Sequence, residues 1–479
     1  MYLGLDLGTS GLKAVLIDED QNLLDEATAP LSVQRPHRGW SEQNPADWLV
    51  ATETVMSAFS DRHKMNRVKA IGLSGQMHGA TLLDAAGEVL RPCMLWNDTR
   101  AHAEAAEMDQ NPEWRAGSGN IVFPGFTAPK VEWVRTHEQP VWRAMDKVLL
   151  PKDYLRLWLT GDMVSDLSDA SGTSWLDPRE RDWSDILLRA SRLSRENMPT
   201  LMEGNAAAGV LRKTLTERWG MRKKVVVAAG AGDNAASAVG MGVVEQGQAF
   251  ISLGTSGVLF AASPDYQPDA PSAVHTFCHA LPGTWHQMGV ILSCTDALNW
   301  YAGLLGTDAK TLTQNLGPVR KPSEALFLPY LGGERTPHND AAARGALLGL
   351  SHGTNREAGT RAVMEGISYA FRDCYDALRS TGTEVSSLVA VGGGSRSEHW
   401  LKMLATVLDL PIDVPAAGDF GGAFGAARLG QMAAVGAGAE LATPPPIART
   451  VTPDHTLTQT FAEAHQKYRA AYHALKEAL

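Results

Sequence analysis

Apolar residues of this chain fall into short runs that are separated by polar or glycine-rich turns. Runs of aliphatic and β-branched residues predict strands at residues 2–6, 13–18, 23–27, 68–73 and 225–229, and again at 250–253, 258–261 and 388–391. Helical spacing predicts helices at 48–59 and 235–239, after the N-cap candidate Ser397, and near the C-terminus. Alternating strands and helices predict an α/β fold, in which ligands bind beyond the carboxyl ends of strands.

The pentapeptide Leu-Gly-Thr-Ser-Gly occurs twice, at residues 7–11 and 253–257, each time after a predicted strand. Glycines let a backbone approach a ligand closely, and consecutive N–H groups with Ser/Thr hydroxyls form an anion-binding concavity. One such turn alone would be an ordinary hairpin turn. Its repetition half a chain length apart favours two related domains that close on one phosphate chain. Only the first copy follows a carboxylate, Asp6 rather than Ser252, so we expect the metal end of the phosphate site at Asp6.

Length, charge and cysteine content limit the compartment and the partners. A chain of 479 residues is too long to fold around a single hydrophobic core, so at least two domains are expected. The formal net charge is −10 and no block of Lys or Arg stands out, so neither nucleic acid nor a membrane surface is an expected partner. Four cysteines without a CxxC pair, no signal-peptide pattern and no long apolar stretch predict a reduced, cytoplasmic protein.

Four polar residues near the ends of predicted strands are candidates for chemistry. Asp233 could be a general base aimed at a hydroxyl, or the N-cap of the helix that follows it, and the two roles are compatible. Asp6 could hold a metal–phosphate group or cap its own turn. Lys13 could reach a phosphate or be a solvated strand residue. No other histidine or acidic residue lies at the sequence spacing of a metal-binding motif from His78. His78 is therefore either a hydrogen-bond partner for the substrate or a buried histidine whose hydrogen bonds are satisfied within the protein.

Three segments resemble the nucleotide motifs of the actin-like, or ribonuclease-H-like, ATPases. Residues 6–13 and 252–257 resemble the two phosphate motifs, and Val391-Gly392-Gly393-Gly394-Ser395 resembles the adenosine motif. Within that superfamily, residues 125–133 fit the first signature of the FGGY carbohydrate kinases and residues 345–350 begin the second. The second signature departs from the family pattern at Ala358 and Gly359, where we expect a helix to start.

The resemblance covers essentially the whole chain and implies two ribonuclease-H-like α/β domains with an interdomain cleft. We expect the N-terminal domain, residues 1–245, to bind the sugar and carry the catalytic base. We expect the C-terminal domain, residues 246–479, to bind ATP. Within the family, the stretches 39–43, 75–79, 95–100 and 332–338 resemble members that phosphorylate D-xylulose at O5.

The resemblance therefore implies a kinase that converts D-xylulose to D-xylulose 5-phosphate in D-xylose catabolism, with ATP and Mg²⁺ and as a homodimer. It implies that Asp233 is the catalytic base and that Asp6 acts with it at the metal. The implied sugar ligands are Met77 and His78, followed by Trp96, Asp98 and Asn234. The implied nucleotide-binding residues are Thr9, Ser10, Lys13, Gly254, Thr255, Gly393, Gly394 and Ser395.

Three alternatives remain open at this stage. The nearest is another kinase of the family, acting on ribulose, gluconate, glycerol or a deoxy sugar. A filament-forming or chaperone ATPase would use both phosphate turns without a sugar pocket, and the stretch Met77-His78 together with Asp233 argues against it. A nonenzymatic sugar sensor would be expected to lose the two carboxylates, which this chain keeps.

Overall fold

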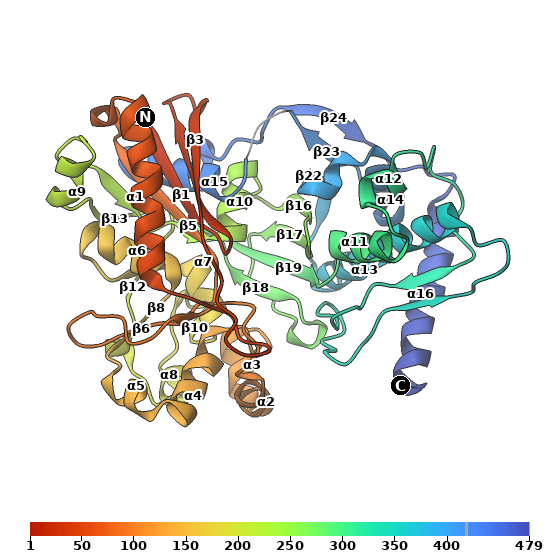
Figure 1. Cartoon of the computed structure of the whole chain (residues 1–479), viewed down its shortest axis with the longest axis horizontal. Coiled ribbons are helices and arrows are strands. Elements are labelled where there is room, and N and C mark those ends of the chain that lie inside the picture. Colours follow the sequence, from red (N-terminus) through yellow and green to blue (C-terminus); the bar gives the residue numbers. More distant parts are fainter. Residues whose placement is uncertain (417–419, 479) are drawn as a thin grey trace.

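The computed structural model describes residues 1–416 and 420–478 and has two α/β halves, each built on a seven-stranded mixed sheet (Figure 1). The first sheet has the order β13 (Ala207–Val210), β14 (Val226–Ala228), β5 (Ala70–Gly75), β1 (Tyr2–Leu7), β2 (Gly11–Ile17) and β3 (Leu23–Pro30), with β15 (Ala231–Gly232) joined to β5. The second has the order β18 (His275–Cys278), β19 (Trp285–Ile291), β17 (Gly257–Ser263), β16 (Gly247–Leu253), β22 (Val385–Val391), β23 (Ile412–Pro415) and β24 (Ile447–Val451). The predicted α/β fold is confirmed.

The two sheets repeat one topology. Strand β1 pairs antiparallel with β2 and parallel with β5. Strand β16 pairs in the same way, antiparallel with β17 and parallel with β22. Both copies of the repeated pentapeptide therefore span the turn of the first hairpin in their sheet, as the duplication in the sequence predicted.

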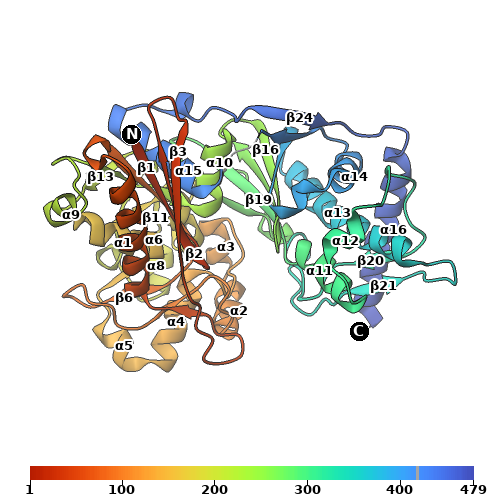
Figure 2. The ribbon, with the colours of Figure 1, turned by 45° about the horizontal axis from the view of Figure 1, so that its top comes forward.

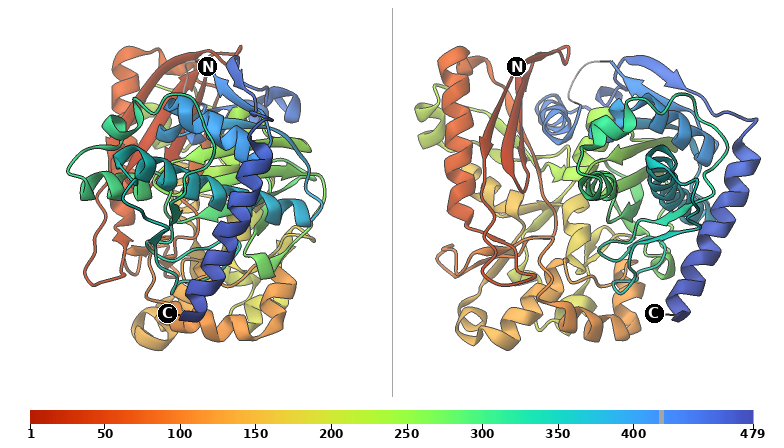
Figure 3. Two further views of the ribbon diagram at one scale, coloured as in Figure 1. Left: turned by 90° about the vertical axis from the view of Figure 1, so that its right-hand side faces the viewer. Right: turned by 45° about the vertical axis from the view of Figure 1, so that its right-hand side comes forward.

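Helices cover the outer faces of both sheets. In the first half, α1 (Pro45–Arg62) and α6 (Pro151–Thr160) pack on a core that includes Leu5 and Trp48. In the second half, α13 (Arg356–Ser380) and α14 (Glu398–Leu408) form the corresponding layer. Ser397 caps α14 by accepting a hydrogen bond from the Trp400 amide at 3.3 Å, as predicted. The C-terminal helix α16 (Thr458–Ala478) runs along the outer side of this half (Figure 3).

Two helices cross between the sheets (Figure 2): α10 (Asp233–Met241) and α15 (Gly422–Val435). Helix α15 packs on β1 and β5 of the first sheet, although its residues fall within the 246–479 segment of the predicted division. Glycines allow this approach, since a Cβ atom on Gly72 would lie 1.7 Å from the Ala426 carbonyl oxygen. A Cβ atom on Gly425 would lie equally close to the carbonyl oxygen of Ala236 in α10.

The inner face of the second sheet completes this contact. Phe250 and Phe260 pack in one cluster with Met77 and Phe126 from the first half. The segment that carries Met77 is thus buried against strands of the other half, so its position depends on how the halves meet.

The remaining elements are short. In the first half they are β4 (Glu42–Gln43), β6 (Thr81–Leu83), β7 (Cys93–Met94), α2 (His102–Gln110), α3 (Pro112–Ser118), α4 (Thr127–His137), α5 (Gln139–Ala144), β8 (Lys147–Leu149), β9 (Val164–Asp166), α7 (Leu167–Ala170), β10 (Leu176–Asp177), β11 (Asp182–Trp183), α8 (Asp185–Ala190), β12 (Thr200–Met202) and α9 (Lys213–Arg218). In the second half they are α11 (Thr295–Leu304), α12 (Ala309–Thr313), β20 (Leu326–Leu328) and β21 (Ala346–Leu348). None of the described helices combines the length and the apolar composition that crossing a bilayer requires.

Candidate active site

Asp6 lies at the end of β1, where three segments meet. It is directly opposite Lys13 in the β1–β2 pair, and its Oδ1 accepts a hydrogen bond from the Ser74 hydroxyl at 2.7 Å. The first residue of α15 also faces it, since a Cβ atom on Gly422 would lie 2.9 Å from the Asp6 carboxyl carbon. A carboxylate is stabilised at the N-terminus of a helix. Asp6 is therefore held by both halves of the chain, rather than by its own turn alone.

Lys13 has a protein partner on the neighbouring strand. Its Nζ lies 3.0 Å from Glu26 Oε2. Because residues opposite one another in an antiparallel pair share a face, Lys13 projects on the same side of the sheet as Asp6. Its predicted contact with a phosphate stays a prediction.

The first phosphate turn is tied directly to the loops that were predicted to bind sugar. Thr9 Oγ1 donates to Gln76 Oε1 at 2.8 Å and accepts from Trp96 Nε1 at 3.0 Å. Gln43 Nε2 donates to the Thr9 carbonyl oxygen at 2.7 Å, and Gln43 Oε1 accepts from Gln76 Nε2 at 2.9 Å. Ser10, at the tip of the turn, is exposed. Gln43 and Gln76 lie within the stretches 39–43 and 75–79, but the sequence alone predicts no role for either residue.

Met77 and His78 follow β5 and lie beside the residue that precedes Asp233. Gly232 pairs with Gly75 at the end of β5, and a Cβ atom on Gly232 would lie 2.9 Å from Met77 Cγ. His78 has a left-handed backbone conformation with φ = 68°, and its ring stacks on Phe126 with 4.5 Å between centroids. The structure thus places the Met77 side chain against the backbone of the residue that precedes the predicted base.

The protonation of His78 follows from its surroundings. Burial lowers its pKa to about 3, so the ring is neutral. Its Nδ1 lies 2.7 Å from the Gly172 carbonyl oxygen, and a carbonyl oxygen can only accept, so Nδ1 carries the proton. Nε2 is therefore an acceptor, suited to a ligand hydroxyl. The Lys130 ammonium and the Thr127 hydroxyl, both in α4, donate to the His78 carbonyl oxygen at 2.9 and 3.2 Å and hold this conformation.

Asp233 is the first residue of α10, whose N-cap is Gly232 without a side-chain hydrogen bond. The alternative of an N-cap role for Asp233 is therefore wrong. Its Oδ1 accepts from the Asn234 amide at 2.8 Å and from Asn234 Nδ2 at 3.0 Å. Its Oδ2 accepts no hydrogen bond from any residue that the structure describes. Burial, and then the nearby negative charge of Asp6, raise the pKa of Asp233 to about 6.

Asp6 and Asp233 therefore form a pair of like charges. Such a pair is relieved by a cation between its members, and carboxylate oxygens are the donors that Mg²⁺ prefers. The two side chains fit the metal that the resemblance implies.

Asp98 differs from the prediction that it binds sugar. Its side chain is fully buried, and both oxygens bind the Arg100 guanidinium, with Nη2 to Oδ2 at 2.6 Å and Nε to Oδ1 at 2.9 Å. The Ser41 amide also donates to Oδ2 at 2.7 Å. With its lone pairs occupied, Asp98 fixes the loop that carries Trp96 and does not itself face a ligand. Trp96 is 39% exposed, as a ligand-facing side chain requires.

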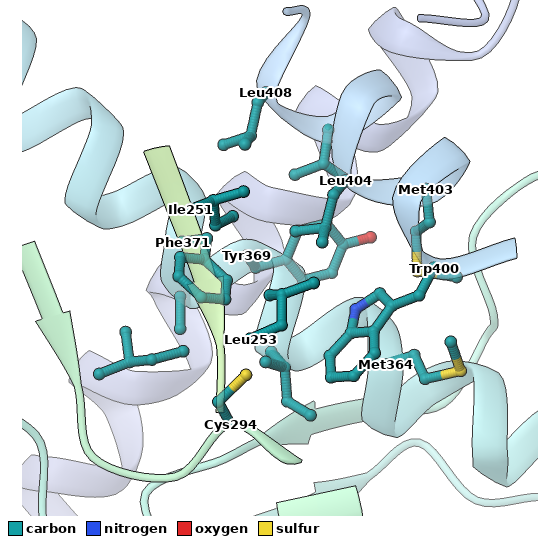
Figure 4. Close-up of a cluster of buried hydrophobic side chains, with 14 of the residues drawn as sticks. Ile251, Leu253, Cys294, Met364, Tyr369, Phe371, Trp400, Met403, Leu404 and Leu408 are labelled. Atoms are coloured by element: carbon teal, nitrogen blue, oxygen red, sulfur yellow. The ribbon is translucent and has the colours of Figure 1, made fainter. Parts of the chain in front are cut away.

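The second phosphate turn and the predicted adenosine motif share one support, the end of β16. The Gly254 carbonyl oxygen accepts from the Thr295 amide at 2.9 Å, and the Thr255 carbonyl oxygen accepts from the Cys294 amide at 2.8 Å. A Cβ atom on Gly392, which has φ = 87°, would lie 2.8 Å from the Leu253 backbone, and one on Gly394 would lie 2.8 Å from Leu253 Cβ. Figure 4 shows Leu253 and Trp400 side by side in the hydrophobic core of the second half. The two motifs are therefore adjacent, as their predicted shared ligand requires.

A groove of about 1330 Å³ opens beside this support. Gly393 and Gly394 line it, together with Thr295, Leu298, Leu316 and Trp400. Gly393 has no atom within 4 Å of the position of a Cβ, so its backbone is accessible. Ser395 donates to the Gly392 carbonyl oxygen at 2.7 Å and stabilises its own turn. An apolar wall beside accessible glycine backbone is what an adenine ring with its ribose requires.

The imperfect second signature falls where a helix start was expected. Asn355 caps α13 and accepts from the Ala358 amide at 2.9 Å. A Cβ atom on Gly359 would lie 2.1 Å from the Tyr301 hydroxyl oxygen. Gly359 thus packs closely against the Tyr301 side chain, and the expectation of a helix start is confirmed.

Comparisons with known proteins agree with the motifs. Residues 1–240 match the model for the N-terminal domain of the FGGY family of carbohydrate kinases, and residues 249–434 match the model for its C-terminal domain. The chain is 49% identical over 437 residues to the xylulose kinase of Escherichia coli (strain K12), covering 91% of this chain and 90% of the relative. It is 47% identical over 442 residues to the xylulose kinase of Klebsiella pneumoniae, covering 90% of each.

Solved structures show the same relationship. A crystal structure of a xyloylose kinase from Brucella ovis has 57% sequence identity and a TM-score of 0.99, covering 100% of both chains. A xylulose kinase from Rhodospirillum rubrum has 27% identity and a TM-score of 0.92, covering 99% of both chains. The two-domain arrangement described above is therefore that of solved sugar kinases.

Proposed function

The chain belongs to the FGGY family of carbohydrate kinases, and we propose that it transfers the γ-phosphoryl group of ATP to O5 of D-xylulose. The product is D-xylulose 5-phosphate, and the reaction is a step of D-xylose catabolism. Similarity to xylulose kinases over nine-tenths of the chain supports the choice of sugar. In the site itself, the observation that carries the proposal is the Asp233 carboxylate, which directly follows Gly232 beside Met77 and whose Oδ2 accepts no hydrogen bond from any described residue.

Phosphoryl transfer depends mainly on positioning and on neutralisation of charge. In the proposed mechanism, Asp233 Oδ2 accepts the proton of the sugar O5 hydroxyl as that oxygen attacks the γ-phosphorus, and the bond from the γ-phosphorus to the β,γ-bridging oxygen breaks to release ADP. His78 Nε2 accepts a hydrogen bond from another sugar hydroxyl. Trp96 and Met77 supply apolar contact, and the Asn234 side chain holds Oδ1 of Asp233 away from the sugar.

The two phosphate turns provide backbone N–H groups for the ATP phosphates, with Thr9 and Thr255 as the side chains in each turn. The glycine motif at 392–394 and the groove beside it hold the adenosine. When bound, Mg²⁺ would supply positive charge that offsets the charge of the phosphates. Asp6 and Asp233 are the residues that would hold it.

Three finer expectations belong to the same proposal. We assign sugar binding and the base to residues 1–245 and ATP binding to residues 246–479, with α15 as the segment that crosses back to the first sheet. The four cysteines are free and buried, which supports a reduced, cytoplasmic environment. A homodimer is expected from the family resemblance alone.

The reaction predicts a specific product. After incubation with D-xylulose and Mg²⁺-ATP, ³¹P NMR with proton correlation should show a phosphomonoester coupled to the C5 methylene protons. Inorganic phosphate as the main phosphorus-containing product besides ADP would contradict the proposal, because it would mean transfer to water.

The pKa of Asp233 predicts the pH dependence. A base must be ionised, so kcat/KM for the sugar should fall as the pH falls through about 6, by about tenfold per pH unit below it. His78 is neutral throughout this range, so a His78→Asn variant should keep the same acid limb at a lower rate. A pH profile of kcat/KM between pH 5 and 8 checks both. Disappearance of the limb in His78→Asn would move the titration from Asp233 to His78.

A further inference from the structure

A buried ionic cluster lies near the start of α10, the helix whose first residue is Asp233. Its members are Lys152, Asp153 and Arg156 from α6, and Asp166 and Asp169 at the junction of β9 and α7, all of them fully buried. Lys152 Nζ lies 2.6 Å from an oxygen of Asp153, 2.6 Å from one of Asp166 and 3.4 Å from one of Asp169. The three carboxylates have the spacing of a metal site, but the lysine ammonium supplies the cation.

The cluster holds the strand that leads to Asp233. Arg156 Nη1 lies 2.9 Å from Asp153 Oδ1. The same guanidinium donates to the carbonyl oxygens of Ala228, at 3.4 Å, and Ala229. Ala228 is the last residue of β14 and Ala229 follows it, five and four positions before Asp233. The carboxyl end of the strand is thus anchored to α6.

A single side chain extends the cluster to the residue before Asp233. Ser168 Oγ donates to Asp166 Oδ1 at 2.5 Å and accepts from the Gly232 amide at 3.1 Å. Asp166 Oδ1 also accepts from the amides of Ser168 and Asp169, at 3.0 Å each, as the N-cap of α7. A continuous chain of hydrogen bonds and ion pairs therefore runs from Lys152 through Asp166 and Ser168 to Gly232.

Contacts on two sides fix the Gly232 backbone. Ser168 Oγ accepts a hydrogen bond from the Gly232 amide. On the other side, the Met77 side chain is so close that a Cβ atom on Gly232 would lie 2.9 Å from Met77 Cγ. Because Gly232 is also the N-cap of α10, its position sets where the helix starts and where the Asp233 side chain projects.

Stability alone does not account for such a cluster. Removing five charged groups from water is costly, and well-packed apolar residues in place of a buried ion pair are often as stable or more so. Asp169 has no hydrogen-bond partner for either oxygen among the described residues, and its burial raises its pKa well above the usual value.

We propose that Ser168 is a positioning residue for Asp233, and that the buried Lys152–Asp166 pair holds Ser168 in place for this purpose. Displacement of a reacting group by about 1 Å can cost a factor of 100 in rate, so a side chain that fixes the Gly232 amide controls turnover without touching the sugar. The effect on rate rests on the proposed function, whereas the effect on the backbone does not.

The experiment compares Ser168→Ala with Ser165→Ala. Ser165 Oγ donates to Asp153 Oδ2 at 2.6 Å and is equally buried, so its removal disturbs the same cluster at a point remote from Gly232. Hydrogen exchange measured by mass spectrometry on a peptide spanning residues 230–236 reports the Gly232 region directly. Steady-state kinetics with D-xylulose give kcat and the KM for ATP.

We expect faster exchange in the 230–236 peptide and an approximately tenfold lower kcat in Ser168→Ala, with KM for ATP within about twofold of the wild-type value. Ser165→Ala should leave both close to wild type. Unchanged exchange at 230–236 in Ser168→Ala would overturn the proposal. So would an equal loss of kcat in the two variants, since it would indicate general destabilisation of the cluster.

A second pair of variants tests the proposal if the alanine variant does not fold. The side chains introduced by Ser168→Thr and Ser168→Val have nearly the same shape, but Thr carries a hydroxyl where Val carries a methyl group. The Thr variant should keep slow hydrogen exchange in the 230–236 peptide and a kcat larger than that of the Val variant. The Val variant should show faster exchange and a lower kcat. Equal behaviour of the pair would contradict the proposal. If the wild-type protein were inactive on D-xylulose, the proposed function would fail while the exchange comparison would still decide the role of Ser168.

Discussion

Replacing Asp233 by Asn lowers kcat by about 10²–10⁴, the usual contribution of a general base, while ATP still binds. The amide has nearly the shape of the carboxylate but cannot accept the proton of the sugar hydroxyl at Oδ2. The fold should tolerate the change, because Asp233 has a pKa near 6 and its neutral form is already accessible in the native state. Steady-state kinetics with saturating D-xylulose, and nucleotide affinity by isothermal titration calorimetry, measure the two effects separately.

The matched control is Asp185→Asn, the same substitution in the first turn of α8. Asp185 is a surface residue whose carboxylate pairs with Arg195 at 2.7 Å, so this variant should keep wild-type kinetics. Near-normal turnover in Asp233→Asn would remove the residue from its role as base. A parallel loss of ATP affinity and kcat would instead assign Asp233 to nucleotide binding.

Replacing Gly72 by Ala destabilises the protein by about 3 kcal/mol or more, since overpacking of a filled contact typically costs about 1–3 kcal/mol and here the obstacle is backbone. The new methyl carbon would lie 1.7 Å from the Ala426 carbonyl oxygen and 2.6 Å from its carbonyl carbon. Strand β5 and helix α15 must therefore separate, and Asp6, which faces Gly422 at the start of that helix, would move relative to the second half. Urea unfolding monitored by tryptophan fluorescence gives the loss of stability.

Gly303→Ala is the control for this substitution. Gly303 lies within α11 and nothing approaches the position of its Cβ within 4 Å. Alanine in place of glycine in an exposed helix stabilises by about 0.5–1 kcal/mol. A Gly72→Ala variant as stable as the wild type would contradict the close packing of α15 on the first sheet.

Local patterns in the sequence determine much of this site. The two hairpin turns were predictable because apolar runs flank each copy of the pentapeptide, and each copy spans the turn of the first hairpin in its sheet. The position of Asp233 was predictable because it follows an apolar run that becomes β14 and precedes a helix of small residues. Each of these features depends on residues close together in the chain.

Other features depend on contacts between distant residues and leave no local pattern. Ser168 and Gly232 are 64 positions apart, and their hydrogen bond is visible only in the folded chain. The placement of α15 on the first sheet depends on glycines that face one another, such as Gly72 and Gly430. From the sequence, Asp98 is expected to bind a ligand. Only the structure shows that it is buried against Arg100 and that its lone pairs are already occupied.

The way in which the two halves contact one another is also visible only in the structure. The division at residues 245 and 246 follows from the duplicated turns and separates the two sheets. Crossing of α10 and α15 between the sheets makes each half contribute a helix to the contact with the other. Closure over a bound sugar would then move Asp233, at the start of α10, relative to the second phosphate turn. Such closure protects ATP from water.

Release of ADP with Mg²⁺-ATP across a panel of sugars, with a blank that lacks sugar, tests the central claim most directly. The panel contains D-xylulose, L-xylulose, D-ribulose, L-ribulose, gluconate and glycerol. The account predicts the highest kcat/KM for D-xylulose and a blank rate far below it. Preference for another sugar would keep the phosphoryl-transfer mechanism and overturn the assignment of the Met77–His78 and Trp96 loops. A blank that releases ADP as fast as the D-xylulose reaction would contradict the claim that this protein is a sugar kinase.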